Sequence, residues 1–278
     1  MFRLLLLMLP LISVSLEARQ IDVVAGWNKP PYIVTSDNSG FEIELAEKIL
    51  ARLGHSINPI YVPFGRTLRQ LKSGRADIVL TVNLSHEISA EYLTDEYVTY
   101  QNSAISLASR QLNLHSVDDL KNYTVLAFQT ARRVLGADFA NATGEHRGYL
   151  EIADQGRQVR MLLLGSVDIA VMDRNIFSWL RSQLPPAQQK DVRIHNLFKQ
   201  TTYRAAIADK GLREGFNREL KAMMKDGQYQ MLADKYRLAI TPDSGDYSNK
   251  ASSIFPGTAA RNNEHVSANM LIRQQRSY

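Results

Sequence analysis

Apolar residues recur along most of the chain in two alternating patterns, short continuous runs and longer stretches with helical spacing. Phe41, Leu45, Ile49 and Leu53 lie four apart and predict an amphipathic helix that ends at Gly54. The short runs on either side are apolar along their length, which is typical of strands covered on both faces. This alternation of strand and helix predicts an α/β fold with parallel strands and right-handed crossovers.

The same alternation occurs twice, and a shorter segment closes the chain. The first series has predicted strands at residues 21–25, 57–62 and 76–82 and helices at 41–54 and 67–74. The second has strands at 124–128, 149–153, 167–172 and 192–197 and helices at 116–123, 130–136, 155–165 and 176–184. Residues 201–236 predict one strand and two helices, which are too few to form a core and are expected to pack on the first series.

One sequence pattern occurs twice, as LKSGRADIVLTV at residues 71–82 and as LLLGSVDIAVMD at residues 162–173. In each copy a helix ends at a glycine, and an aspartate precedes a buried strand. Two α/β domains can share such a unit by chance, but the identical spacing favours two similar lobes. The strands then end at Thr81–Asn83 and at Met172–Arg174, and ligands of open parallel sheets bind at strand carboxyl ends.

We therefore expect two lobes joined by two crossings that form a hinge. Residues 19–106 and 203–240 make the first lobe, and residues 107–202 make the second. The crossings are expected near Ser103–Arg110 and Leu197–Tyr203. Residues 241–278 are polar and aperiodic, which predicts a disordered tail.

The N-terminus predicts export. Arg3 precedes the apolar run Leu4–Val14, which is too short to span a bilayer, and cleavage is expected after Ala18. The alternative is a retained membrane anchor, which the short run and the cleavage-like end disfavour. The mature chain, residues 19–278, is therefore expected to be soluble and, in a bacterium, periplasmic.

Composition excludes several classes of chemistry. The 278 residues contain no cysteine, so disulfides, thiolate catalysis and cysteine-based zinc sites are absent. The net charge of +5 is spread along the chain without a Lys/Arg block, so no nucleic-acid partner is expected. The six histidines show no ligand spacing, and no metal site is expected.

Seven stretches occur in the order typical of one known family. They are WNKPPYIV, SGFEIELAEKILARLG, LKSGRADIVLTV, YLTDEY, VDDLKNYTVLAF, GSVDIAVMDRNI and MMKDGQYQMLADKY. Over about residues 20–240 the chain resembles the extracellular solute-binding proteins of family 3, the periplasmic binding proteins of amino-acid ABC transporters.

The resemblance implies a two-lobe Venus-flytrap fold in which each lobe is a mainly parallel sheet flanked by helices, with two hinge crossings. It implies a small polar solute, amino-acid-like or carboxylate-bearing, that the lobes close on. It also implies an ABC permease or a separate membrane receptor as partner, a monomer, and no cofactor.

Two departures from the family concern the ligand's carboxylate. Relatives that bind α-amino acids place an arginine shortly after the third strand, but Ala76 to Ser109 contains none. Neither serine nor histidine replaces a bidentate guanidinium at equal strength. In the second lobe the family's Gly-Thr is QTAR here, which keeps Thr130 without the glycine.

Two charged residues are candidates for opposite ends of a solute. Asp173 follows a buried strand where the family often holds an acid for an ammonium group, although aspartate is also a favoured N-cap for the helix after it. Arg66 follows the second strand and is the candidate carboxylate clamp, although a solvated surface arginine is the commoner case.

The remaining binding candidates lie on loops at strand ends. They are Trp27, Tyr32, Thr81, Asn83, Thr130 and Arg132. The two aromatic residues flank a Pro-Pro pair and could cover a ligand or stack on a cation, although Trp27 could equally pack in the core. Thr130 and Arg132 begin a helix, where free N–H groups bind anions, although Arg132 could simply be exposed.

Three functions compete on this fold. A binding protein without catalytic residues is favoured. An enzyme similar to periplasmic cyclohexadienyl dehydratases would use His86, Glu87 and Glu91, but no paired constellation stands out. A ligand-sensing partner of a separate membrane receptor is the third.

Overall fold

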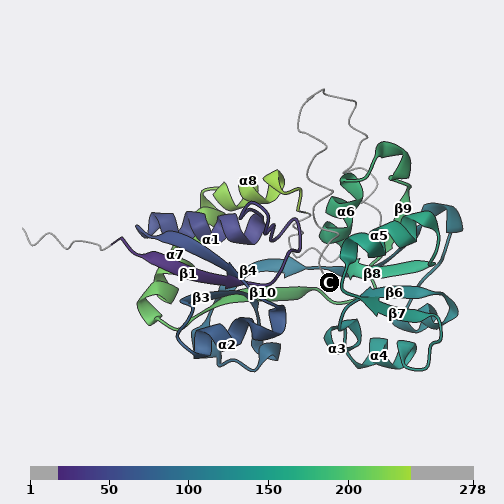
Figure 1. The fold of residues 1–278 in the computed structure, drawn as a ribbon, viewed down its shortest axis with the longest axis horizontal. Coiled ribbons are helices and arrows are strands. Elements are labelled where there is room, and N and C mark those ends of the chain that lie inside the picture. The colour runs from purple at the N-terminus through teal and green to yellow at the C-terminus, as the bar shows by residue number, and fades with distance from the viewer. Residues whose placement is uncertain (1–17, 239–278) are drawn as a thin grey trace, which may run out of the picture. The chain divides into compact units, whose positions relative to one another are not determined.

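The computed structural model describes residues 18–238, which form two lobes, each a five-stranded sheet flanked by helices (Figure 1). The strands of the first sheet are β1 (Gln20–Ala25), β2 (Ser56–Tyr61), β3 (Ile78–Val82), β4 (Leu93–Tyr100) and β10 (Thr201–Ile207). Those of the second are β5 (Asn102–Leu107), β6 (Val125–Phe128), β7 (Tyr149–Ile152), β8 (Ile169–Asp173) and β9 (Val192–His195). The orders β2-β1-β3-β10-β4 and β7-β6-β8-β5-β9 repeat one topology, and the expected two-lobe α/β fold is confirmed.

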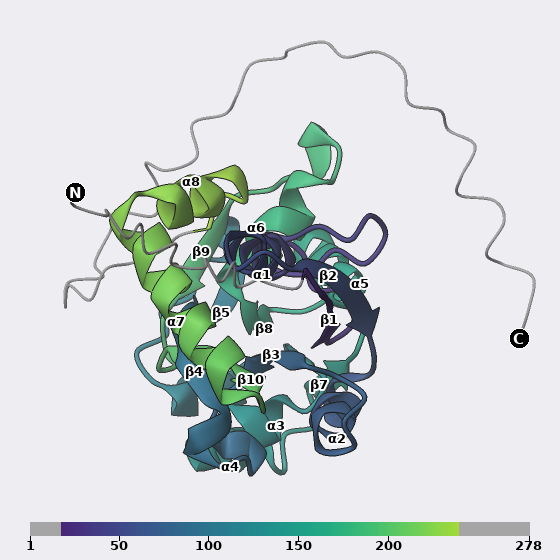
Figure 2. The ribbon, with the colours of Figure 1, turned by 90° about the vertical axis from the view of Figure 1, so that its left-hand side faces the viewer.

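Each sheet has helices on both faces (Figures 1 and 2). The helices of the first lobe are α1 (Phe41–Arg52), α2 (Thr67–Lys72), α7 (Lys210–Lys225) and α8 (Gln228–Lys235). Those of the second lobe are α3 (Ala131–Val134), α4 (Ala137–Thr143), α5 (Gln155–Leu164) and α6 (Arg174–Ser182). Within residues 18–238 no helix is both long enough and apolar enough to cross a membrane. The predicted signal peptide, residues 1–18, lies outside the described residues except for Ala18, and the predicted tail at 241–278 lies outside them entirely.

Alternate residues of the central strands face opposite helical layers. Ile21 and Val23 of β1 belong to the cluster that includes α1, α7 and α8, whereas Val24 belongs to the cluster that includes α2. In β8, Met172 packs with α5 and α6, while Val171 packs on the side of α4. Burial on both faces explains why these strands are apolar along their length.

Both sheets are mixed rather than mainly parallel. β1 pairs in parallel with β2 and β3, whereas β10 is antiparallel to β3 and β4. Likewise β6 is parallel to β7 and β8, while β5 is antiparallel to β8 and β9. The antiparallel pairs involve the strands beside the lobe crossings, where the chain enters a sheet without the covering helix that a parallel connection needs.

The first crossing between the sheets is very short. β4 ends at Tyr100 and β5 begins at Asn102, so Gln101 alone separates a strand of one lobe from a strand of the other. The expected crossing at Ser103–Arg110 coincides with β5 and the turn after it, so the chain changes sheets earlier than the sequence pattern indicates. The return crossing lies between β9 and β10.

The repeated sequence pattern has the same local geometry in both lobes. Gly74 and Gly165 follow α2 and α5 with φ of 67° and 78°, a conformation that a residue with a Cβ adopts at a cost. The Asp77 carboxylate accepts from the N–H of Asp22 (2.9 Å), and the Asp168 carboxylate accepts from the N–H of Thr124 (2.9 Å). Each aspartate therefore ties the start of its central strand to the neighbouring parallel strand.

Candidate functional site

Polar side chains from both lobes meet at the carboxyl ends of the strands. We call this group the interlobe cluster; it consists of Lys29, Tyr32, Glu42, Thr81, Tyr97, Tyr100, Asp173, Asn175 and Tyr203. The loop after β1, the start of α1, the ends of β3 and β4, and β10 supply the first-lobe members. The end of β8 and the start of α6 supply the second-lobe members.

Glu42 is fully buried at the start of α1. Its carboxylate accepts hydrogen bonds from the Thr81 hydroxyl (2.7 Å), the Tyr100 hydroxyl (2.5 Å) and the Tyr97 hydroxyl. Burial, together with the Glu42 charge, raises the pKa of both tyrosines well above their usual value, so both remain hydroxyl donors. A buried carboxylate requires such donors, and its place in the first turn of α1 adds the favourable helix dipole.

Lys29 is the cation of the interlobe cluster. Its Nζ lies 3.8 Å from Glu42 Oε1, 3.1 Å from Thr81 Oγ1 and 5.0 Å from the centre of the Tyr100 ring. Burial lowers the pKa of Lys29, while the charges of Glu42 and Asp173 act in the opposite direction. The ammonium group is therefore held by one carboxylate, one hydroxyl and one ring face.

Asp173 ends β8 and is 3 % exposed. Its Oδ1 accepts from the N–H groups of Asn175 (2.9 Å) and Ile176 (3.0 Å), so the N-cap interpretation is confirmed. Its Oδ2 accepts from the N–H of Gln101 (2.9 Å), the residue of the first crossing. Burial raises the pKa of Asp173 to about 6, although these hydrogen bonds act in the opposite direction.

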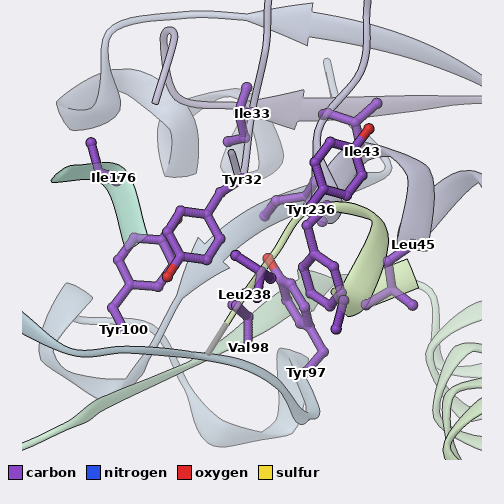
Figure 3. Close-up of a cluster of buried hydrophobic side chains, with 14 of the residues drawn as sticks. Tyr32, Ile33, Ile43, Leu45, Tyr97, Val98, Tyr100, Ile176, Tyr236 and Leu238 are labelled. Atoms are coloured by element: carbon purple, nitrogen blue, oxygen red, sulfur yellow. The ribbon is translucent and has the colours of Figure 1, made fainter. Parts of the chain in front are cut away.

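Tyr32 joins the acid of the second lobe to the first lobe. Its hydroxyl donates to Asp173 Oδ1 (3.2 Å) and accepts from Asn175 Nδ2 (2.9 Å). Its ring stacks on Tyr100 with centroids 4.0 Å apart (Figure 3), and Tyr203 meets the Tyr100 ring edge-on at 5.0 Å. Strand ends of both lobes thus share a polar cluster with aromatic walls.

A second arrangement lies where β6 turns into α3. The carboxylate of Glu151, on β7, accepts from the backbone N–H groups of Thr130 (2.7 Å) and Arg132 (3.0 Å) and from the Tyr149 hydroxyl (2.7 Å). Burial alone would raise the pKa of Glu151, but these donors lower it, so the group is ionised at neutral pH. A cavity of about 460 Å³ opens here, lined by these four residues with Arg133 and Leu150.

The Arg132 guanidinium is directed toward its own lobe. It lies over the Tyr149 ring at 4.3 Å and donates to the Thr143 hydroxyl (3.1 Å) and to backbone carbonyls at the end of α4. A cation on a ring face with carbonyl acceptors is already well satisfied.

The predicted site residues fall into two groups. Tyr32, Thr81 and Asp173 lie together in the interlobe cluster, and Thr130 and Arg132 lie together at the β6–α3 turn. Of the others, Asn83 caps a short 3-10 turn through its side chain and reaches the carbonyl of Thr202 at 3.4 Å.

The remaining predicted residues are on the surface. Trp27 is 64 % exposed, so the alternative that it packs in the core is wrong. Arg66 is exposed in a 3-10 turn. The acids of the enzyme alternative, Glu87 and Glu91, are exposed too, while His86 is half-buried, where burial lowers its pKa. Among residues 18–238 no three His, Asp or Glu side chains gather as a metal site would require.

Sequence reasoning missed the other six members of the interlobe cluster, which are Lys29, Glu42, Tyr97, Tyr100, Asn175 and Tyr203. One signal was available for Glu42, since it lies on the helix face that also carries Ala46 and Ile49, both buried. An acid in an apolar stripe indicates a buried partner. No comparable pattern marks the lysine, because a single basic residue in a loop is usually solvated.

Comparisons with solved structures agree with this geometry at the level of fold. An ancestral arginine-binding protein bound to arginine is similar with a TM-score of 0.62, at 22 % identity over 78 % of this chain and 97 % of that one. A histidine kinase sensor domain with similarity to periplasmic binding proteins gives 0.61, at 18 % identity over 79 % and 96 %. An ancestral amino-acid-binding protein described as a precursor of cyclohexadienyl dehydratase gives 0.59, at 21 % identity over 78 % and 95 %.

A comparison with curated protein sequences found no match. The model of one protein family, in contrast, matches residues 16–239, which include every described element. The chain belongs to the bacterial extracellular solute-binding proteins of family 3.

Proposed function

We propose that this chain holds a small polar, amine-bearing solute between its two lobes, in the periplasm and as a monomer, and presents it to an ABC-type permease or to a membrane sensor. The observation that carries the proposal is the position of Asp173. This buried acid of the second lobe contacts Tyr32 of the first lobe, at the carboxyl ends of the strands where ligands of such sheets bind.

The chemistry of the interlobe cluster suits a solute with an amine. Asp173 can accept hydrogen bonds from an ammonium group, and the hydroxyls of Tyr32 and Thr81 can orient one. Burial strengthens such charge-assisted bonds, because the competing water is excluded.

The delivery step is proposed from four observations. The family consists of extracellular proteins, and the N-terminal sequence has the features of a signal peptide. One similar structure binds arginine and another is the sensor domain of a histidine kinase, which supports uptake and sensing as the two possible uses of a bound solute.

The test is a binding measurement with a matched pair of variants. Native mass spectrometry of the purified chain would identify a co-purified solute by mass, and isothermal titration would measure its affinity. Asp173→Asn should weaken binding at least tenfold. Asp209→Asn is the control, because Asp209 also caps a helix, α7 (2.6 Å to the Leu212 N–H), and follows β10 at the end of the first sheet where β3 begins. Equal affinity in wild type and Asp173→Asn would refute the proposal.

A second candidate function is proton transfer to the bound solute. A buried acid with a pKa of about 6 next to a tyrosine hydroxyl can exchange a proton near neutral pH. The similarity to a dehydratase precursor supports the same idea at the level of fold. Turnover of prephenate or arogenate by the wild type, lost in Asp173→Asn, would favour an enzyme over a binding protein.

A further inference from the structure

Resting on the proposed function, we infer that the solute is an organic cation without a carboxylate, such as an amine, a diamine or a guanidine, rather than an α-amino acid. Three features carry this inference: the charge balance of the interlobe cluster, its tyrosine rings, and the contacts of the residues predicted to bind a carboxylate.

The interlobe cluster contains two carboxylates and one ammonium group. Lys29 lies 3.8 Å from Glu42 and also interacts electrostatically with Asp173, so one ammonium group faces two carboxylates. Asp173 is held on the second lobe by neutral donors, namely three backbone N–H groups and the Tyr32 hydroxyl. A cationic solute supplies the opposite charge that a buried carboxylate favours, whereas a zwitterion also brings a second anion close to Glu42 and Asp173.

The walls of the interlobe cluster suit a cation as well. Tyr32 and Tyr100 are stacked, and Tyr203 meets Tyr100 edge-on. Lys29 already places its ammonium group 5.0 Å from the centre of the Tyr100 ring, so this environment accommodates a positive charge on a ring face. Tyrosine faces attract cations through their negative quadrupole and give no such attraction to a carboxylate.

The groups predicted to bind a carboxylate are engaged or exposed. Glu151 holds the N–H groups of Thr130 and Arg132, and its charge would repel a solute carboxylate that approached this turn. The Arg132 guanidinium is bonded to the end of α4, and Arg66 is exposed. Between Ala76 and Ser109 the sequence offers no arginine in their place.

The test compares solutes that differ only by the carboxylate. Isothermal titration of the mature chain is run with the pairs agmatine and arginine, cadaverine and lysine, and putrescine and ornithine. At least one decarboxylated member should bind tenfold or more tightly than its amino acid. Tighter or equal binding of the amino acid in every pair, or no binding of any decarboxylated member, overturns the inference.

Two variants test the reason for the discrimination. Glu151→Gln removes the internal carboxylate and should narrow the affinity ratio of the best pair at least threefold. Glu145→Gln is the matched control, because Glu145 is an exposed acid of the same lobe. The affinity ratio of the best pair should stay unchanged in this variant. A ratio that is unchanged in Glu151→Gln would show that Glu151 does not select against a carboxylate.

The outcomes separate this inference from the proposed function. Binding of an amino acid or an organic acid that Asp173→Asn abolishes would keep solute binding and refute the cationic class. Binding of a diamine that Asp173→Asn leaves intact would refute the assigned site and keep the class of solute.

Discussion

The Tyr32 hydroxyl links the first lobe directly to Asp173 through a hydrogen bond, and Tyr32→Phe removes this hydroxyl alone. The phenylalanine ring keeps the stack on Tyr100, so the buried apolar volume hardly changes. Two hydrogen bonds are lost: the one to Asp173 Oδ1 (3.2 Å) and the one from Asn175 Nδ2 (2.9 Å).

The magnitude follows from these two bonds. A buried hydrogen bond contributes about 1 kcal/mol net to stability, and Tyr32→Phe removes two of them. We therefore expect Tyr32→Phe to lower the free energy of unfolding by about 2 kcal/mol. For a chain of this size that corresponds to a fall in Tm of about 4–8 °C.

The assay is urea unfolding followed by circular dichroism, with thermal melts as a second measurement. Tyr92→Phe is the control, because Tyr92 is 38 % exposed and its hydroxyl can exchange hydrogen bonds with water. The control should change stability by less than about 0.5 kcal/mol. If Tyr32→Phe changed the free energy of unfolding as little as Tyr92→Phe, the contact between the lobes would contribute nothing to stability and the reasoning would be wrong.

Two further predictions concern stability. Because burial raises the pKa of Asp173 from 3.8 to about 6, the unfolded chain ionises first as the pH rises, and this group should remove up to about 3 kcal/mol of stability between pH 4 and pH 6. Unfolding of wild type and Asp173→Asn across that window should show the wild type losing more stability, and parallel curves would contradict the prediction. Gly40 has φ of 110°, and a Cβ there would lie 2.5 Å from the Tyr32 carbonyl oxygen, so Gly40→Ala should cost at least about 3 kcal/mol in a urea melt. Gly65→Ala, where a Cβ meets nothing within 4 Å, should stay within about 1 kcal/mol, and similar losses in both variants would refute the steric argument.

Strands that are buried on both faces could be predicted from sequence, and strands beside the crossings could not. β1, β3, β6 and β8 are apolar runs of four to six residues, a length that indicates strands rather than helices. β4, in contrast, buries pairs of consecutive residues, 93–94 and 97–98, and its pairing with β10 contains bulges. Its buried residues therefore follow neither the helical nor the strand period. α4 buries Phe139 and Thr143 alone, which is too weak a pattern to recognise.

The candidate site divides in the same way. Tyr32, Thr81 and Asp173 could be predicted because ligands of such sheets bind at strand carboxyl ends. Applying that rule requires only the order of strands and helices along the chain. Lys29 and Glu42 require the packing of the loop after β1 against α1 and β3, and sequence spacing does not encode that distance. Arg66 is exposed, so the absence of the family arginine between Ala76 and Ser109 does not indicate where another carboxylate-binding residue lies.

The single-residue crossing at Gln101 has a consequence for how an electrostatic event is transmitted. The backbone N–H of Gln101 donates to Asp173 Oδ2 at 2.9 Å, so the peptide that connects the sheets is also a ligand of the buried acid. Any rotation of the backbone at that peptide changes this bond and with it the proton affinity of the carboxylate. The coupling is reciprocal. Neutralising Asp173 with a proton or a bound cation therefore changes the free-energy difference between backbone conformations at Gln101 by the same amount.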